Sequence, residues 1–135
     1  MRLILSAATI LLCACSTGMQ SGDPAADVHL TVQPTPSAAG DSIVLTLHNG
    51  TDGQIGYNLC ASSLSRRTAD GWTAVPSDVV CTMELRLLEG GQSASYGTTL
   101  PRALSPGEYR YNTSIEVMQT NERHAISSSG FTVTS

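Results

Sequence analysis

Few side chains in this 135-residue sequence could carry out chemistry, and the three histidines are the first to consider. His29 and His48 lie in segments where apolar and polar residues alternate, so we expect both to point away from the apolar faces of neighbouring strands. That arrangement could bring two imidazoles together, but two ligands without a third make a weak metal site. His124, in the polar run at residues 121–124, is expected to lie in a loop. Solvated surface histidines are the favoured interpretation, and no metal site is predicted.

Nucleophiles and acid–base pairs are equally hard to assign. Serine is abundant, but no Gly-x-Ser-x-Gly elbow occurs, and spacing singles out no combination of Ser, His and an acid. The carboxylates are scattered, mostly in turns, and strand geometry forces no two of them together for acid–base work. The sequence therefore predicts a protein that is not an enzyme and has no cofactor. A hydrolase with an unrecognised site is kept as a third functional hypothesis.

The first two of the four cysteines, Cys13 and Cys15, close an apolar run near the start of the chain. Arg2 provides a positive charge and residues 3–12 the apolar stretch of a secretory signal, which is shorter than the roughly 20 residues of a membrane-spanning helix. The Leu-Cys-Ala-Cys segment that ends at Cys15 resembles the lipobox of bacterial lipoproteins. This resemblance implies cleavage just before Cys15, a thioether-linked lipid on its sulfur, and acylation of the new amino terminus, for instance by palmitate.

The lipoprotein interpretation divides the chain into three parts. Residues 1–14 are the signal peptide, residues 15–27 are the lipidated Cys and a small, polar, flexible tether, and residues 28–135 are the folded domain. Ser16 follows the anchor Cys, and by resemblance to enteric lipoproteins this implies transfer to the outer membrane, facing the periplasm. The alternative is an ordinary secretory signal. It fits less well, because Leu12 would occupy a position where the general signal peptidase favours small residues.

Cys60 and Cys81 lie outside the signal. In the oxidising envelope that the anchor implies, two such thiols are expected to form a disulfide. The bond would close a loop of roughly 20 residues and stabilise the domain by about 3 kcal/mol in the chain-entropy description. Metal binding by this pair alone is disfavoured, because no second pair and no nearby His completes a tetrahedral set.

From residue 28 onward the sequence is typical of short antiparallel strands. Apolar and polar residues alternate with a period of two, and turn residues interrupt the alternation about every 8 to 12 residues. No later segment keeps a 3.6-residue apolar period for three turns, so helix content should be low. The expected strands cover residues 28–32, 43–47, 55–59, 63–68, 72–75, 83–87, 93–100 and 109–117, with a closing strand, bent near Gly130, that includes Ile126, Phe131 and Val133.

The segment Leu-Ser-Pro-Gly-Glu-Tyr at 104–109 is similar to the corner that leads into the sixth strand of immunoglobulin-like sandwiches. In that corner a Tyr two residues after a Gly donates a hydrogen bond back to nearby backbone. The resemblance therefore implies a structural corner formed by Leu104, Gly107 and Tyr109.

A wider pattern is similar to the immunoglobulin-like domains of secreted and anchored bacterial proteins, over about residues 27–135. It includes Asp-Gly-Trp-Thr-Ala-Val-Pro at 70–76 and the closing Gly-Phe-Thr-Val at 130–133. The chain departs from antibody-type domains at Tyr111, which replaces the second bridging Cys, so the inter-sheet disulfide is absent. The fold implied is an all-β, immunoglobulin-like antiparallel β-sandwich. The spacing also resembles small bacterial proteinase inhibitors with an immunoglobulin-like fold.

Arg66 and Arg67 face Trp72 across a predicted hairpin and form a candidate binding edge, because Trp and Arg are enriched at binding hot spots. The structural alternative is that the Trp ring packs on the sheet while the Arg stems cover it. The chain carries a net charge of −4 and has no Lys, which argues against nucleic acid as a partner because few groups could neutralise a phosphate backbone.

The sequence thus predicts a lipid-anchored protein of the bacterial cell envelope whose domain is a non-catalytic binding or structural module. Its expected partners are the membrane, through the anchor, and an unknown envelope protein. The alternative function is inhibition of a periplasmic proteinase or lysozyme. For that alternative the candidate contacts are the loop near Arg66 and the segment at residues 98–102.

Overall fold

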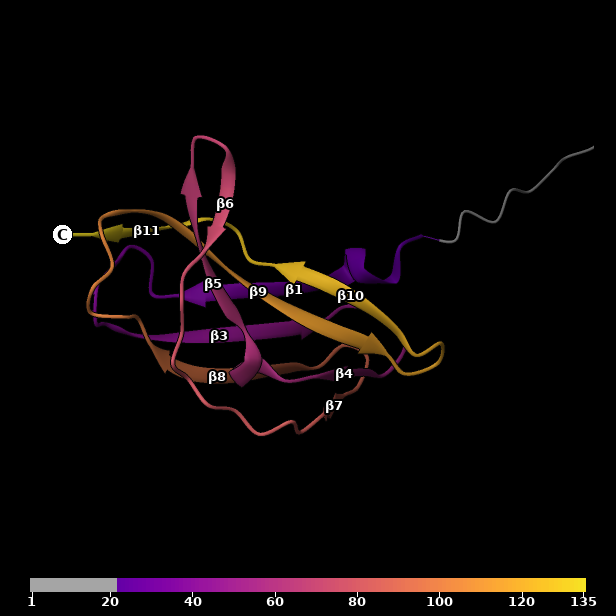
Figure 1. The fold of residues 1–135 in the computed structure, drawn as a ribbon. Helices are drawn as coiled ribbons and strands as arrows, with labels where there is room; N and C mark the ends of the chain where they lie inside the picture. Colours follow the sequence, from indigo (N-terminus) through magenta and orange to yellow (C-terminus); the bar gives the residue numbers. More distant parts are fainter. Residues whose placement is uncertain (1–21) are drawn as a thin grey trace, which may run out of the picture.

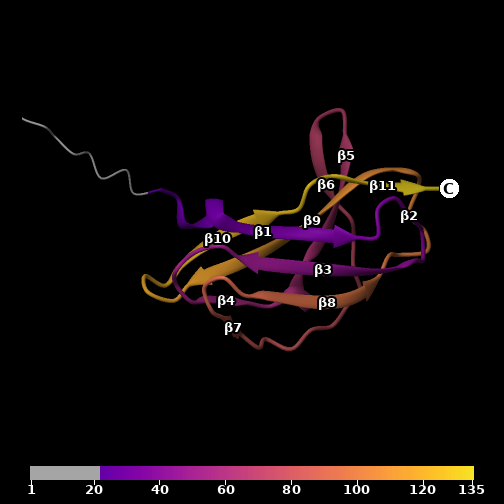
Figure 2. The same ribbon diagram turned by 180° about the vertical axis from the view of Figure 1, so that it is seen from behind.

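The computed structural model describes residues 22–135, which form two packed β-sheets (Figure 1). The expected signal peptide, Cys15 and residues 16–21 lie outside the described residues. Sheet A has the strand order β1-β3-β8 and faces the reader in Figure 2. Its strands are β1 (Val28–Gln33), β3 (Ser42–Asn49) and β8 (Ser93–Thr99). In the described part of the chain, no helix has the length and hydrophobicity of a membrane span.

Sheet B is built around the eleven-residue strand β9 and has the order β2-β11-β9-β4-β7. Three further strands join it: β10 and β5 pair with β9, and β6 pairs with β5. The closing strand expected from the sequence is therefore two strands, β10 and β11, both paired with β9. The bounds are β2 (Ser37–Ala38), β4 (Ile55–Tyr57), β5 (Ser63–Thr68), β6 (Gly71–Ala74), β7 (Arg86–Leu88), β9 (Gly107–Val117), β10 (Glu122–Ser127) and β11 (Phe131–Thr134).

The first two strands of the domain belong to different sheets. β1 belongs to sheet A, whereas β2 pairs in parallel with β11 of sheet B. Pro34 and Pro36 separate them, and a proline interrupts a strand because it has no N–H to donate to the ladder. A three-stranded sheet packed on a larger sheet that is centred on β9 is an immunoglobulin-like arrangement. The all-β immunoglobulin-like sandwich predicted from the sequence is confirmed.

The core lies between the sheets and is formed by alternate residues of the strands. In β1 the side chains alternate strictly between buried and exposed, with Val28, Leu30 and Val32 inside. Tyr111 of β9 fills the position of the missing bridge Cys, and its ring stacks on Phe131 with 6.1 Å between ring centres. The Tyr111 and Phe131 rings, both from sheet B, therefore pack together in the core.

The segment before β9 makes the hydrogen bond of a tyrosine corner. Tyr109, which is 1% exposed, donates its hydroxyl to the carbonyl oxygen of Ser105 at 2.7 Å. Leu104 packs against the core just before this point, and Gly107 begins β9. The corner therefore fixes the direction in which the chain enters the central strand.

The predicted disulfide between Cys60 and Cys81 is present. Cys60 lies in a short 3-10 turn, η2 (Leu59–Ala61), so the strand expected over 55–59 ends at Tyr57. Cys81 lies in an irregular segment between β6 and β7. The bond therefore attaches this irregular segment to the turn that separates β4 from β5.

The alternation at residues 83–87 predicts a strand with a buried apolar face, and this prediction is wrong. Only Arg86–Leu88 form a strand, and Leu88 faces the core. Met83 is fully exposed, and Leu85 and Leu87 are 48% and 53% exposed. A shift of one residue exchanges the two faces of a strand, so the burial of Leu88 turns the other three side chains outward.

Two other local predictions are also wrong. His124 lies in β10 rather than in a loop, because residues 122–127 pair with residues 112–117 of β9. Its Nδ1 lies 3.6 Å from the Asp23 carboxylate. Pro24–Asp27, expected to belong to the flexible tether, form a 3-10 turn, η1, which Asp23 caps by accepting a hydrogen bond from the backbone N–H of Ala25.

Candidate interaction surface

The hairpin formed by β5 and β6 projects from sheet B, as the pink loop at the top of Figure 1 shows. β5 pairs with β9 over Ser63–Arg66 only, so Arg67 and Thr68 continue past β9 with β6 as their partner. The turn returns through Gly71, whose φ of 125° is readily adopted only by glycine. The hairpin therefore presents its side chains beyond the body of the domain.

Two guanidinium groups lie over the ring of Trp72, one from this hairpin and one from β9. Arg67 lies directly opposite Trp72 in the β5–β6 register, and its guanidinium carbon is 5.6 Å from the ring centre. Arg110 approaches from β9, and its guanidinium carbon is 4.4 Å from the ring centre. Cations attract the face of an indole ring, so the half-buried Trp72 is fixed in place. Of the edge predicted from Arg66, Arg67 and Trp72, only Arg67 and Trp72 come together, and they are joined by Arg110, which the sequence analysis missed.

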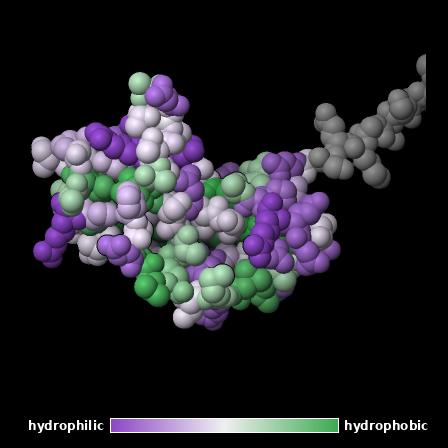
Figure 3. Space-filling view, in the orientation of Figure 1, coloured by the Kyte–Doolittle hydropathy of each residue, from purple (hydrophilic) through white to green (hydrophobic). Residues whose placement is uncertain are grey.

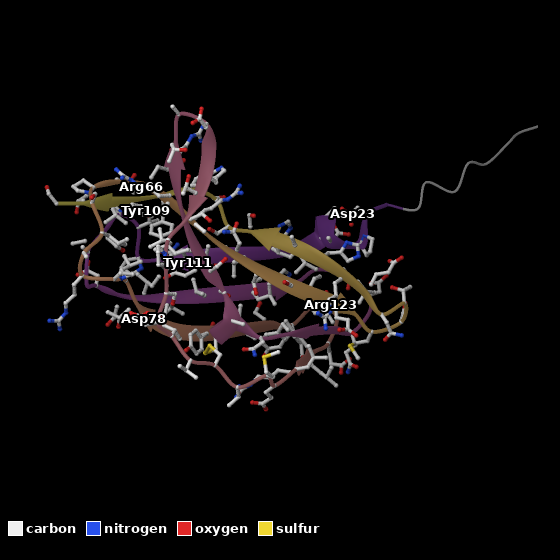
Figure 4. All side chains as sticks on the ribbon, in the orientation of Figure 1. Asp23, Arg66, Asp78, Tyr109, Tyr111 and Arg123 are labelled. Carbon is white, nitrogen blue, oxygen red and sulfur yellow. A yellow bond between two sulfur atoms is a disulfide. The ribbon has the colours of Figure 1, made fainter. Side chains whose placement is uncertain are left out.

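Hydrogen bonds and charge complete the surroundings of this surface. Arg66 lies opposite Tyr109 at the base of the hairpin and donates to the carbonyl oxygen of Pro106 at 3.3 Å (Figure 4). Arg67 lies 3.6 Å from Glu108, and both side chains are exposed. An exposed pair of this kind contributes little to stability, but it orients the guanidinium. Arg66, which pairs with Thr73 and Tyr109, lies on the other face of the hairpin. We call the set Arg67, Trp72 and Arg110 the hairpin surface.

A row of polar side chains links three strands beside the hairpin surface. Asn112 of β9 donates its amide to the hydroxyl of Ser65 in β5 at 2.9 Å, and the hydroxyl of Ser127 in β10 donates to the Asn112 carbonyl oxygen at the same distance. These bonds cross β5, β9 and β10 on the outer side of sheet B. The strand that carries Arg110 is therefore held on both sides by side chains as well as by backbone.

A second exposed feature lies on the same side of β9 but at its other end, beside β4 rather than β5, and the sequence analysis did not identify it. Five of the six large apolar residues exposed in the described part of the chain lie between residues 79 and 87. In Figure 3 they contribute to the green area along the lower edge of the molecule. Clustered apolar side chains on a surface often mark a contact site. The five are Val79, Val80, Met83, Leu85 and Leu87.

A hollow of about 240 Å³ adjoins this apolar segment. Gly56 forms part of its floor because it carries no side chain, and Met83 and Leu85 line it from the segment. β4 and β5 are separated by η2, so Thr113 and Ser114 of β9, which also line the hollow, have no strand partner on that side. The interruption of the sheet thus creates the hollow.

The remaining sequence candidates are dispersed. His29 lies directly opposite His48, and the His48 Nδ1 is 2.9 Å from the Ser93 hydroxyl. Across residues 22–135, no three His, Cys, Asp or Glu side chains are placed to hold a metal ion. In the segment at 98–102, proposed as an inhibitor contact, Leu100 is 1% exposed and belongs to the core. Thr99, Pro101 and Arg102 of that segment are exposed.

Comparisons with known proteins give a similarity of fold only. No protein-family model and no curated protein sequence matches the chain. The chain is similar to a PapD-like (ASH) domain of human CEP192, with 14% identity, a TM-score of 0.47, and coverage of 98% of this chain and 97% of that one. It is also similar to the putative ApaA protein of Bordetella pertussis, with 14% identity, a TM-score of 0.46, and coverage of 78% and 89%. The function therefore has to be argued from the surface of this chain.

Proposed function

We propose that this protein is a non-catalytic interaction module, held at the bacterial cell envelope by a lipid on Cys15, that binds an acidic surface of a partner protein through its hairpin surface. The immunoglobulin-like sandwich is compatible with a binding or structural role. The observation that carries the proposal is the contact of Trp72, on a projecting hairpin, with the guanidinium groups of both Arg67 and Arg110.

The chemistry of the hairpin surface favours a partner rich in carboxylates. Two arginines, Arg67 and Arg110, gather there on a chain whose net charge is −4, and one of them, Arg67, also forms an ion pair with Glu108. Guanidinium groups bind carboxylates through paired, charge-assisted hydrogen bonds. Because the Trp72 ring and its two guanidiniums are already ordered, binding would immobilise few additional side chains, which lowers its entropic cost.

The proposed anchor would keep the hairpin surface close to a membrane. The proposal is supported by the lipobox resemblance at Cys15, which lies seven residues before Gly22, the first described residue. Seven residues span at most about 25 Å when fully extended. The domain would therefore encounter partners that are themselves anchored in, or close to, the same membrane.

Cross-linking in intact cells tests the binding role. The epitope-tagged full chain, Arg110→Glu and Trp72→Ala variants, and an Arg123→Ala control are compared. Arg123 is a suitable control because it is an exposed arginine of the same sheet with a single ion-pair partner, Glu116. We expect one defined envelope protein to be recovered with the unmodified chain and the control and to be lost with the two hairpin variants. Recovery of only abundant bystanders, or of the same partner with all four proteins, would refute the proposal.

The anchor has its own test. Intact mass of the protein extracted from membranes should show loss of residues 1–14, the added acyl chains, and the two-hydrogen deficit of the Cys60–Cys81 bond. Cys15→Ala should abolish lipid addition. The variant should then no longer be found in the membrane fraction. An unmodified Cys15 in the mature protein would exclude lipid anchoring while leaving the proposed hairpin contact to be tested separately.

A further inference from the structure

We propose that the segment at residues 83–87, which includes the start of β7, pairs antiparallel with the same segment of a second copy, so that the protein forms a two-fold symmetric dimer. The inference does not depend on the proposed function, because this segment lies beside β4, at the other end of β9 from the hairpin surface.

The backbone of this segment is free to pair. In the described part of the chain, β7 has one partner strand, β4, so its other side is an open sheet edge. Residues 83–85, which precede β7, make no backbone-to-backbone hydrogen bond with any other described residue. Exposed sheet edges readily pair with strands from other molecules unless charge, proline or a covering element prevents it. Neither a proline nor a lysine is present in this segment.

The sequence Met-Glu-Leu-Arg-Leu complements itself when two copies run antiparallel about Leu85. Leu85 then faces Leu85 of the second copy, Met83 faces Leu87, and Glu84 faces Arg86. The three apolar side chains are all at least 48% exposed in the single chain and would cover one another. The two charged residues, 3.7 Å apart within one chain, would each meet an opposite charge in the other chain.

A second copy is the partner that this edge favours, because the same apolar and charged pairs form on both sides of Leu85. A two-fold contact uses one patch twice, so that patch must be complementary to itself. Opposite charges placed directly across an antiparallel pair are favourable, whereas like charges are unfavourable. A shift of the pairing by two residues would place Glu84 opposite Glu84 in one direction, or Arg86 opposite Arg86 in the other. The charges therefore also select the register.

Charge reversal provides the first test, with the full chain purified in detergent and its mass measured by light scattering. Glu84→Arg alone, or Arg86→Glu alone, places like charges across both halves of the dimer and should weaken association about tenfold or more. The double variant Glu84→Arg/Arg86→Glu should associate like the unmodified chain, and a mixture of the two single variants should form mixed dimers. Both side chains are exposed, so the substitutions should not affect folding, and circular dichroism of each variant is the check. A monomeric full chain at about 100 µM, or equal association of all variants, would overturn the proposal.

Cross-linking gives an independent test of the register. A Leu85→Cys variant should form a disulfide-linked dimer in an oxidising compartment, because a residue on the two-fold axis of an antiparallel pair lies within disulfide distance of its counterpart. Val44→Cys is the matched control, since Val44 is similarly exposed, at 42%, on sheet A. A dimer with Leu85→Cys and not with Val44→Cys supports the pairing. Equal cross-linking of the two, or none, argues against it.

Discussion

The guanidinium carbon of Arg110 lies 4.4 Å from the centre of the Trp72 ring, although the strands that carry them, β9 and β6, do not pair with each other. β5 lies between these strands and pairs with both. The side-chain contact therefore crosses an entire strand and attaches the projecting hairpin to the centre of sheet B. It connects the exposed hairpin to β9, the central strand of sheet B.

A double-mutant cycle measures this contact. Arg110→Ala and Trp72→Ala should each destabilise the domain, and the double variant should lose less than the sum of the two. The expected coupling energy is about 1 kcal/mol, the range of a partly exposed cation–π contact. Urea unfolding followed by far-ultraviolet circular dichroism is suitable, because Trp72 is the only tryptophan and its removal abolishes tryptophan fluorescence. The same cycle with Arg123→Ala should give no coupling, and equal values for both arginines would contradict this interpretation.

The corner hydrogen bond gives a second prediction. Tyr109→Phe removes the hydroxyl that Ser105 O accepts at 2.7 Å and leaves the rest of the ring in the core. The expected loss is about 1 kcal/mol of unfolding free energy, the net value of one such bond. Tyr96→Phe, in the half-exposed position of β8, is the control and should change stability by less than about 0.5 kcal/mol. Equal losses in the two variants would show that the corner bond does not contribute.

The sequence predicts the fold well wherever one face of a strand is fully buried. In β9 the alternation from Tyr109 to Ile115 is unambiguous, and the structure places those residues inside. The same logic fails for Met83, Leu85 and Leu87. They belong to an edge where the core takes only Leu88, and because the adjacent Leu87 and Leu88 are both apolar, the pattern does not decide which phase faces inward. The exposure of this segment could not be deduced without knowing its neighbours.

For a related reason, the sequence predicts the hairpin residues of the candidate site but not Arg110. Arg66, Arg67 and Trp72 lie on one hairpin, and the short turn between them fixes their proximity. Arg110 is 38 positions beyond Trp72, and its contact depends on the register of β5 against β9. Local spacing predicts contacts within a hairpin, whereas contacts between strands distant in sequence require the sheet order. His124 was misplaced for the same reason, since its strand exists only through pairing with β9.

Asn49 supports a third prediction, because its buried amide uses all of its hydrogen-bonding capacity. The Nδ2 donates to the carbonyl oxygens of Gly53 and Leu88 at 2.8 and 3.1 Å, and the Oδ1 accepts from the N–H and hydroxyl of Thr51. Asn49→Asp preserves the shape but replaces the donor with an oxygen that faces two carbonyl oxygens. The expected loss is about 3 kcal/mol or more of unfolding free energy.

Asn112→Asp is the matched control for that substitution. Asn112 is only partly buried, and its amide donates to the Ser65 hydroxyl, which can rotate and donate to a carboxylate instead. Its expected loss is less than about 1 kcal/mol. Both variants are compared by urea unfolding at neutral pH. Similar losses for the two would show that burial of Asn49 and its carbonyl partners do not determine the cost.

Tyr111 predicts how stability depends on alkaline pH. Burial raises the pKa of its hydroxyl from 10.0 to about 12. Below pH 10 the tyrosine is neutral in both states, so its contribution is fully present. Between pH 10 and pH 12 the unfolded chain loses the proton and the folded chain keeps it, so stability falls by an amount on the order of 2 kcal/mol. Above pH 12 both states are ionised, and this residue causes no further loss.

Tyr111→Phe isolates this contribution. The variant keeps the ring that stacks on Phe131 and should match the unmodified protein at pH 7 to within about 1 kcal/mol. It should lose less stability than the unmodified protein when the pH is raised from 7 through the interval between the two pKa values, because it has no phenol to ionise at this position. Urea unfolding of both proteins at each pH gives the difference directly. If the two curves stay parallel across that interval, the hydroxyl of Tyr111 ionises equally in the folded and unfolded chains, and its burial does not protect the proton.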